Sequence, residues 1–223
     1  MIQKQLFFSW LIGLTEGDGS FIKNKNGYLK FKITQSSEDV QILYLIQDQL
    51  GFGYVSVKDK NQKTHHYRVR KKEHLLFLIH LFNGSLLTEK AKIRFKNWVC
   101  AFNQKYKAKI VLKHPLKWTS PNLKNSWLCG FTDAEGCFNV TLINRFKTYI
   151  QVQVRFILSQ KGELEILNKF TKLFGGKISY LKSYNGFNMT VNLLKLQTVI
   201  EYFERHPLKT RKEKTFQYWK GIY

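Results

Sequence analysis

A short apolar stretch that ends in acids occurs twice in this chain, at positions 117 residues apart. Residues 9–21 read SWLIGLTEGDGSF and residues 126–138 read SWLCGFTDAEGCF, with seven of 13 positions identical. Three further pairs are conservative, namely Leu14/Phe131, Glu16/Asp133 and Asp18/Glu135. Agreement this close over a short window indicates duplication, so we predict that the chain folds as two copies of one structural unit.

The residues after each copy show the same order of periodic patterns. In the first half we expect strands at 21–25, 28–35, 54–58 and 64–70, and helices at 40–50, 73–81 and 88–106. In the second half we expect strands at 138–143, 149–160, 177–181 and 187–192, and helices at 164–174, 194–203 and 210–223. Gly51 and Gly175 follow the first predicted helix of each set and are typical of helix C-termini. The predicted fold class is α+β, with an αββαββα unit repeated.

The predicted repeats are separated by a segment without a counterpart. We assign residues 1–106 to the N-terminal repeat, 107–125 to a basic linker and 126–223 to the C-terminal repeat. The linker holds two of the three prolines, Pro115 and Pro121, and five lysines. Each repeat is near 100 residues long, which is enough to bury its own core.

The chain is strongly basic, with 37 Lys and Arg against 15 acids and a net charge of +22. Such a charge predicts a polyanionic partner, either nucleic acid or an anionic membrane. No apolar run reaches membrane-spanning length, and Glu16 and Asp18 interrupt the one apolar stretch near the N-terminus. A hydrophobic content of 43% makes disorder a poor description of most of the chain.

Two compositional features concern the cellular location. The three cysteines form no Cys-x-x-Cys pair and no zinc spacing with histidine, which favours free thiols in a reducing, intracellular compartment. The abundance of Lys, Asn, Ile, Phe and Tyr reflects AT-rich codons and weakly indicates an organellar genome, in a mitochondrion or a chloroplast.

The predicted strands alternate between apolar and polar side chains, as in antiparallel sheets with one buried and one solvated face. An ordinary solvated face would alternate in the same way. Here the polar positions hold almost no acids and many side chains that bind phosphates and base edges. We therefore expect DNA contacts from Lys23, Lys30, Lys32, Thr34, His66, Arg68, Arg70, Asn139, Thr141, Gln151, Gln153, Arg155, Asn188, Thr190 and Asn192. His65, adjacent to His66, should point to the opposite face, which argues against a histidine metal site.

The acids of the repeated stretch lie where a helix should end. With Ser9 as the predicted N-cap and Gly19 as the predicted C′ residue, Asp18 falls at the C-terminal end. A carboxylate is unfavourable there by roughly 0.3–1 kcal/mol, because the exposed carbonyl groups carry partial negative charge. The same arrangement in both repeats predicts a bound cation, and an oxygen-rich site suits Mg²⁺ better than zinc.

Small residues predict how the two motif helices meet. Gly13 and Gly17 are spaced i, i+4, and Gly130 and Ala134 occupy the same places in the second copy. If these helices pack together, Asp18 and Glu135 lie at one end of the seam, where their repulsion requires divalent ions. The alternative is that the small residues serve tight core packing and the acids are solvated helix ends.

Both stretches resemble the LAGLIDADG motif of homing endonucleases, and the chain resembles the single-chain members that carry two motifs. The resemblance implies a pseudo-twofold pair of αββαββα units with the motif helices at the interface and two sheets forming a saddle on duplex DNA. It also implies that the eighth motif position, Asp18 or Glu135, binds the metal. The preceding residues, Gly17 and Ala134, would offer backbone carbonyls.

The resemblance extends to weaker positions. Gln35 and Gln160 fit the place of a polar residue that positions active-site water. The segments LLTEK and LKTRK align, which points to Lys90 and Lys212 as the basic residues near the last helix, although Glu89 stands where the second copy has Arg211. Glu16 and Asp133 at motif position six are expected to be structural or electrostatic.

The implied function is a site-specific double-strand DNA endonuclease that acts as a monomer without an obligate protein partner. Water attacks a phosphodiester on each strand with Mg²⁺, and short 3′ overhangs result. Mn²⁺ or Ca²⁺ can occupy the same site. The competing hypothesis is an intron-encoded RNA maturase with the host intron RNA as partner, or a protein that does both. A DNA-binding regulator without activity ranks last, because both acids are present.

Overall fold

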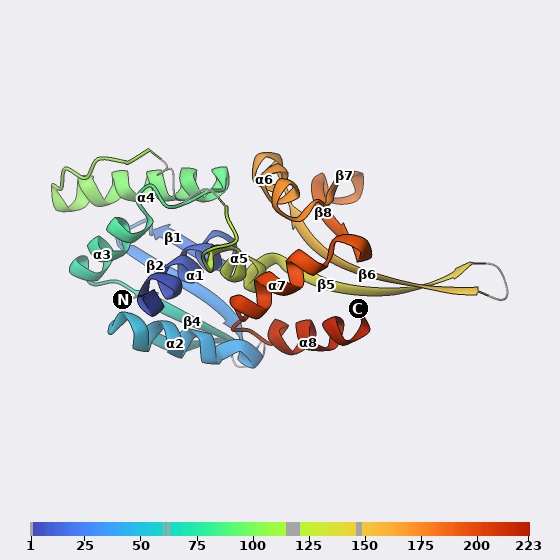
Figure 1. The fold of residues 1–223 in the computed structure, drawn as a ribbon. Coiled ribbons are helices and arrows are strands. Elements are labelled where there is room, and N and C mark those ends of the chain that lie inside the picture. The colour runs from blue at the N-terminus through green and yellow to red at the C-terminus, as the bar shows by residue number, and fades with distance from the viewer. Residues whose placement is uncertain (1, 60, 62, 115–120, 146–148) are drawn as a thin grey trace. The chain divides into compact units, whose positions relative to one another are not determined.

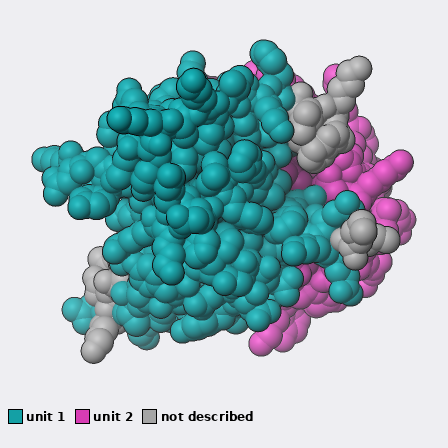
Figure 2. Space-filling view, turned by 90° about the vertical axis from the view of Figure 1, so that its left-hand side faces the viewer, with its two compact units in different colours: residues 1–120 teal, residues 121–223 magenta. Residues whose placement is uncertain are grey.

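The structure is a computed structural model that describes residues 2–59, 61, 63–114, 121–145 and 149–223 (Figure 1). The chain divides into two compact units, residues 1–120 and 121–223, which are coloured separately in Figure 2. The boundary falls inside the segment 107–125 that the sequence predicts as a linker. Pro115, one of the two prolines of that segment, lies outside the described residues.

Unit 1 is a four-stranded antiparallel sheet with helices packed on it. Its strands are β1 (Gly19–Lys23), β2 (Leu29–Ser36), β3 (Tyr54–Asp59) and β4 (Thr64–Val69), in the spatial order β1-β2-β4-β3. Its helices are α1 (Ile2–Asp18), α2 (Val40–Leu50), α3 (Lys72–Phe82) and α4 (Glu89–Tyr106).

Unit 2 repeats this topology. Its strands are β5 (Gly136–Arg145), β6 (Tyr149–Gln160), β7 (Lys177–Leu181) and β8 (Gly186–Asn192), in the order β5-β6-β8-β7. Its helices are α5 (Trp127–Glu135), α6 (Leu164–Phe174), α7 (Gln197–Arg205) and α8 (Lys212–Ile222). The predicted α+β class and the repeated order of elements are therefore confirmed. The β5–β6 hairpin extends well beyond the rest of its unit (Figure 1).

The duplication reaches into the core as a set of aromatic contacts that the sequence comparison did not identify. Phe21 of β1 contacts four aromatic rings at centroid distances of 5.2 to 5.6 Å, those of Phe31, Phe82, Phe95 and Trp98. Phe138 of β5 contacts the equivalent four at 5.1 to 5.4 Å, those of Phe156, Phe203, Phe216 and Trp219. Each cluster joins the first hairpin to the last two helices, so one face of each sheet is covered by helices.

Two predictions about the first motif helix are wrong. The helix begins at Ile2, so Ser9 lies inside it and does not cap it. Gly19 follows the helix directly but opens β1 without the positive φ of a C′ glycine. The need for glycine is steric, since a Cβ on Gly19 would lie 2.4 Å from the carbonyl oxygen of Thr15. Gly136 is constrained in the same way by Thr132.

A histidine at the end of α7, His206, should make the stability of unit 2 depend on pH. The His206 ring is hydrogen-bonded to Ser126 Oγ at 3.2 Å and lies 4.9 Å from the Tyr202 ring. Burial, with a smaller effect of Arg205, lowers the pKa of His206 below its ordinary value of 6.5, although a hydrogen bond from the His206 ring to the Leu123 backbone opposes this. The unfolded chain therefore takes up this proton at a higher pH than the folded chain.

The contribution of His206 should be complete above about pH 6.5 and should decrease as the pH falls below it. We expect the melting temperature to fall between about pH 7.5 and pH 5, and to fall less in the His206→Gln variant. Thermal unfolding monitored by circular dichroism at both pH values measures this difference. Equal pH dependence in the two proteins would contradict the assignment.

Within the described ranges, no helix combines the length and the apolar content that crossing a bilayer requires.

Candidate functional site

The first motif acid lies beside the glutamine that the sequence predicted for it. Asp18 is the last residue of α1 and is half-buried. Gly19 pairs with Ile33 in β2, and Gln35 is two residues farther along the same strand and on the same face. Gln35 Nε2 donates a hydrogen bond to Asp18 Oδ2 at 2.5 Å. The short connection from helix to strand thus brings this amide and this carboxylate together.

Unit 2 has the same register around its motif acid. Glu135 ends α5 and is exposed. Gly136 pairs with Leu158 in β6, and Gln160 lies two residues beyond Leu158. Gln35 and Gln160 therefore hold equivalent positions, as predicted, although the two hairpins differ in length.

A basic side chain reaches the last turn of each motif helix. In unit 2, Lys212 Nζ donates to the carbonyl oxygens of Thr132 at 3.0 Å and Ala134 at 3.1 Å. In unit 1, Arg94 donates to the carbonyl oxygens of Glu16 at 3.3 Å and Gly19 at 3.5 Å. A cation is favourable at these positions because the helix C-terminus carries partial negative charge.

Arg94 is a site residue that the sequence comparison missed. The alignment of LLTEK with LKTRK assigned the basic position of unit 1 to Lys90, which is exposed. Arg94 is one helical turn farther along α4 and therefore lies on the same side of that helix. This i, i+4 spacing is the sequence signal that could have identified Arg94 as a second candidate.

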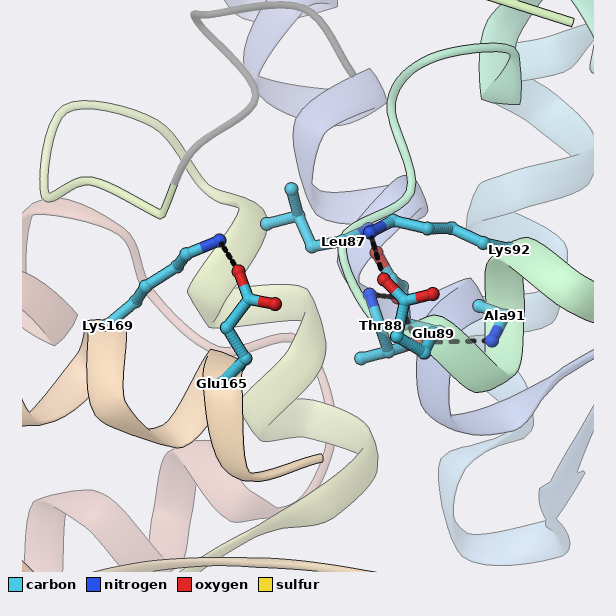
Figure 3. A network of polar contacts seen from close by, with 8 residues as sticks. Leu87, Thr88, Glu89, Ala91, Lys92, Glu165 and Lys169 are labelled. Atoms are coloured by element: carbon cyan, nitrogen blue, oxygen red, sulfur yellow. Dashed lines mark hydrogen bonds and ion pairs between the residues drawn. The ribbon is translucent and has the colours of Figure 1, made fainter. Parts of the chain in front are cut away.

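The acids at motif position six are structural, as expected. The Glu16 carboxylate accepts hydrogen bonds from Leu87 N at 2.6 Å, Thr88 N at 2.8 Å and Thr88 Oγ1 at 2.5 Å. Thr88 in turn caps α4 by accepting from Ala91 N at 3.3 Å, as Figure 3 shows. Glu16 thereby ties the motif helix to the start of the last helix of its unit.

Asp133 makes the equivalent connection in unit 2. Its carboxylate accepts from Lys209 N at 3.1 Å, Thr210 N at 3.1 Å and Thr210 Oγ1 at 2.6 Å. Both acids are buried, with exposures of 5% for Glu16 and 4% for Asp133. Because they are committed to these donors inside the protein, neither is suited to bind a metal ion.

The groups that remain for a metal are oxygen ligands. Each motif helix ends with one carboxylate, Asp18 or Glu135, and with last-turn carbonyl groups that include those of Gly17 and Ala134. No cluster of three or more His, Cys, Asp or Glu side chains occurs among the residues that the structure describes. A hard cation such as Mg²⁺ or Ca²⁺ fits these ligands, whereas a zinc site of nitrogen and sulfur ligands does not.

The polar face of the first sheet contains most of the residues predicted for it. In register, Lys32 is opposite Arg68, Thr34 is opposite His66, and Lys30 lies on the same face. The prediction that His66 contacts DNA is corrected, because the residue is only 3% exposed. Its Nδ1 is hydrogen-bonded to Thr34 Oγ1 at 2.9 Å, so it positions Thr34 on this face.

Two details of this sheet concern residues on its other side. Lys23 is paired with the buried Leu29 and shares the helix-covered face with Phe21, so its assignment to the polar face is corrected. The alternation from Phe21 already required this placement. His65 lies on the face opposite His66, as predicted, and its Nδ1 is 3.2 Å from Ser37 Oγ.

In the second sheet all eight predicted residues share one face. The register places Asn139 opposite Arg155, Thr141 opposite Gln153, and Ile143 opposite Gln151. Asn188, Thr190 and Asn192 follow on β8, where Asn192 is opposite Arg155. Part of this face is formed by the long β5–β6 hairpin. Its strands have 10 and 12 residues, whereas β1 and β2, the equivalent strands of unit 1, have 5 and 8.

Arg155 is held in place at the centre of this face. Its Nη2 donates to Asn139 Oδ1 at 2.7 Å and to Thr141 Oγ1 at 2.9 Å, and its Nε donates to Asn139 Oδ1 at 3.2 Å. An arginine oriented in this way loses less conformational entropy when it binds a base edge or a phosphate.

The small residues predicted at the helix interface lie within the motif helices, Gly13 and Gly17 in α1 and Gly130 and Ala134 in α5. Each unit is described by itself, and the packing of α1 against α5 therefore stays a prediction.

Comparison with known proteins identifies the family to which this chain belongs. Residues 11–102 and 128–223 match the family model described as LAGLIDADG endonuclease. The chain therefore belongs to the LAGLIDADG endonuclease family, and each of its two units carries one copy of the family motif.

Two relatives have names that indicate different activities. The chain is 49% identical over 224 residues to probable intron-encoded endonuclease 4 of Neurospora crassa, covering 100% of this chain and 41% of that protein. It is 32% identical over 210 residues to intron-encoded RNA maturase bI4 of Saccharomyces cerevisiae, covering 93% of this chain and 31% of that protein. The chain thus spans less than half the length of both relatives.

Solved structures show the same fold at low identity. The LAGLIDADG meganuclease I-AabMI bound to uncleaved DNA superposes with a TM-score of 0.78 at 20% identity, covering 96% of this chain and 89% of that chain. The LAGLIDADG homing endonuclease I-LtrWI bound to target DNA gives a TM-score of 0.79 at 21% identity, covering 98% and 90%.

Proposed function

We propose that this protein is a homing endonuclease that cuts both strands of a specific DNA site with divalent metal and leaves short 3′ overhangs. The observation that carries the proposal is the acid at the last turn of both motif helices in a member of the LAGLIDADG endonuclease family. Asp18 is oriented by Gln35, and Glu135 is exposed with Gln160 at the equivalent register position.

The proposed DNA contact is supported by charge and by the two polar sheet faces. A net charge of +22 favours a polyanion, and the faces carry Lys, Arg, Gln, Asn and Thr, which bind phosphates and base edges. Two structural neighbours are described as bound to DNA. In our proposal α1 and α5 pack through their small residues, so that a monomer places both sheets on one duplex as a saddle.

The residues of the site have separate roles in this proposal. Asp18 and Glu135, with the carbonyls of Gly17 and Ala134, would hold Mg²⁺, and Mn²⁺ or Ca²⁺ could occupy the same position. Bound metal supplies Lewis-acid stabilisation of the phosphate and lowers the pKa of the attacking water. Gln35 fixes the orientation of the Asp18 carboxylate by its hydrogen bond. Lys212 and Arg94 offset the negative potential of the last-turn carbonyls, and Lys90 is a weaker candidate for the same role.

The direct test is cleavage by the wild-type protein. Purified protein with Mg²⁺ is incubated with a plasmid library that carries the host region where the intron would insert. We expect linear product from one target, with ends that carry short 3′ overhangs, and no product with EDTA. Failure to linearise any plasmid in the library would refute the proposed nuclease function.

A second candidate function is RNA maturation, because the relative from Saccharomyces cerevisiae is named an RNA maturase. The host intron RNA would then be a further partner. A splicing assay with the Asp18→Asn variant separates the activities, since retained splicing with lost cleavage identifies a protein that does both. Two relatives are named as intron-encoded, and another is named as a cox1 intron-2 protein. These names lead us to place the protein in an organelle, with the mitochondrion preferred.

A further inference from the structure

A basic pocket lies at the edge of the first sheet, away from the motif acid of that unit. It has a volume of about 320 Å³ and is formed by the loop before β3, the end of β4 and the start of α3. The side chains that matter for its chemistry are those of Phe52, Tyr54, Arg68, Arg70, Lys71 and His74.

The positively charged side chains around this pocket repel one another when no anion is bound. Arg70, Lys71 and Lys72 stand at the N-terminus of α3, where the helix dipole favours anions. Lys71 is the N-cap residue, and no side chain caps this helix. Glu73 is in the first turn but does not line the pocket. Among the described residues, neither Arg70 nor Lys71 forms an ion pair. The Lys72 ammonium lies over the Tyr106 ring at 5.3 Å and does not line the pocket. The cations that line it are Arg68, Arg70 and Lys71, beside an uncapped helix N-terminus, and such a cluster predicts an anionic ligand.

The walls of the pocket are held by specific contacts. Tyr67 OH donates to the carbonyl oxygen of Phe52 at 2.8 Å, and Gln47 Nε2 donates to that of Gly53 at 3.2 Å. Gly53 has a φ of 89°, and a Cβ there would lie 2.4 Å from the Tyr67 ring. The Phe52 ring stacks on the His74 ring at 4.2 Å. These contacts hold the loop in the shape that forms the wall of the pocket.

The basic side chains are oriented by aromatic groups and by the sheet. The Arg70 guanidinium lies over the Tyr54 ring at 5.7 Å. Arg68 is opposite both Tyr54 and Lys32 in register, so the pocket is continuous with the polar face of the sheet. Arg68 Nε is buried and has no hydrogen-bond partner among the described residues. An oxyanion at this position would meet guanidinium donors and the free N–H groups of a helix N-terminus.

We propose that this pocket binds a backbone phosphate of the DNA duplex. The inference deepens the proposed function and rests on it. Because the ligand is a phosphate, the pocket would increase affinity for any DNA sequence and would not select bases. This role assigns Arg70, which the sequence predicts as a DNA contact, to sequence-independent anchoring.

The test compares the Arg70→Ala/Lys71→Ala double variant with a control, Lys96→Ala. All three side chains are exposed, and Lys96 lies on α4 in the helical layer. Binding is measured by fluorescence anisotropy with the target duplex and with an unrelated duplex over a range of salt concentrations, in Ca²⁺ to prevent cleavage. We expect the double variant to bind both duplexes roughly tenfold more weakly. Its slope of log affinity against log salt should decrease by about 0.9 per lost phosphate contact.

The Lys96→Ala control should behave as wild type, and equal melting temperatures would show that both variants are folded. Weaker binding to the target duplex alone would mean that the pocket reads bases, and unchanged binding to both would mean that DNA does not enter it. With the host intron RNA as a third probe in the same assay, weaker binding of the double variant to the RNA alone would assign the pocket to RNA. Each of these three results overturns the inference. A wild-type protein that binds DNA but never cleaves it would instead overturn the proposed nuclease function and leave the pocket assignment intact.

Discussion

The Asp18→Asn variant should lose double-strand cleavage by roughly a thousandfold, since Lewis-acid stabilisation by a bound metal contributes several kcal/mol. Its fold should remain intact and gain roughly 0.3–1 kcal/mol, because the substitution removes a negative charge from the C-terminal end of α1. Asparagine keeps an oxygen that can accept the hydrogen bond from Gln35. A residue whose loss abolishes activity while stability rises serves function and not folding.

Cleavage is measured under single-turnover conditions with each strand labelled, and stability by urea unfolding. The Glu135→Gln variant is the matched substitution in unit 2. Because one acid is half-buried and the other is exposed, we expect the two variants to slow the nicking of opposite strands to different extents. Cleavage at the wild-type rate in both variants would remove Asp18 and Glu135 from the catalytic machinery.

The Glu16→Ala variant should lose roughly 3 kcal/mol of unfolding free energy. Its carboxylate is buried and accepts three hydrogen bonds from Leu87 and Thr88 at the start of α4. Removing it leaves two backbone N–H groups and a hydroxyl without this acceptor, and each buried unsatisfied donor costs roughly 1–3 kcal/mol.

The control for this prediction is Glu89→Ala at the start of α4, next to Thr88, which the Glu16 carboxylate contacts. Glu89 is exposed and forms a surface ion pair with Lys92 at 2.6 Å, so its loss should change stability by no more than about 0.5 kcal/mol. A comparable exposed pair in unit 2, Glu165 with Lys169 at 2.7 Å, is also drawn in Figure 3. Equal destabilisation by Glu16→Ala and Glu89→Ala in urea unfolding would refute the structural role of Glu16.

Glu16 and Asp18 show why a motif alone does not assign its residues. They are two positions apart in the same helix turn, and both are acids. Glu16 points to the start of α4, which is more than 70 residues away in the chain, whereas Asp18 meets Gln35 on β2. Nothing in the spacing of the motif distinguishes these environments, because each depends on a segment that is distant in sequence.

Errors in the sequence interpretation have the same origin. The N-cap at Ser9 is a local prediction, whereas the helix begins at Ile2 and packs Phe7 and Trp10 into the core. Arg94 lies outside the aligned segments LLTEK and LKTRK, yet its guanidinium donates to the carbonyl oxygens of Gly19 in β1 and Glu16 in α1, which are 75 and 78 residues away. Such contacts require the packing of the whole unit.

The order of helices and strands, the duplication and the polar side of each sheet follow from the sequence alone, because periodicity and turn residues act over a few neighbours. Gly51 and Gly175 end their helices with φ values of 71° and 69°, as their positions predicted. The tertiary structure determines that Glu16 is buried whereas Asp18 lies beside Gln35. It also determines that Arg94 and Lys212 contact the ends of the motif helices, and that the arginines beside α3 line a pocket. These properties arise between segments that only tertiary packing brings together.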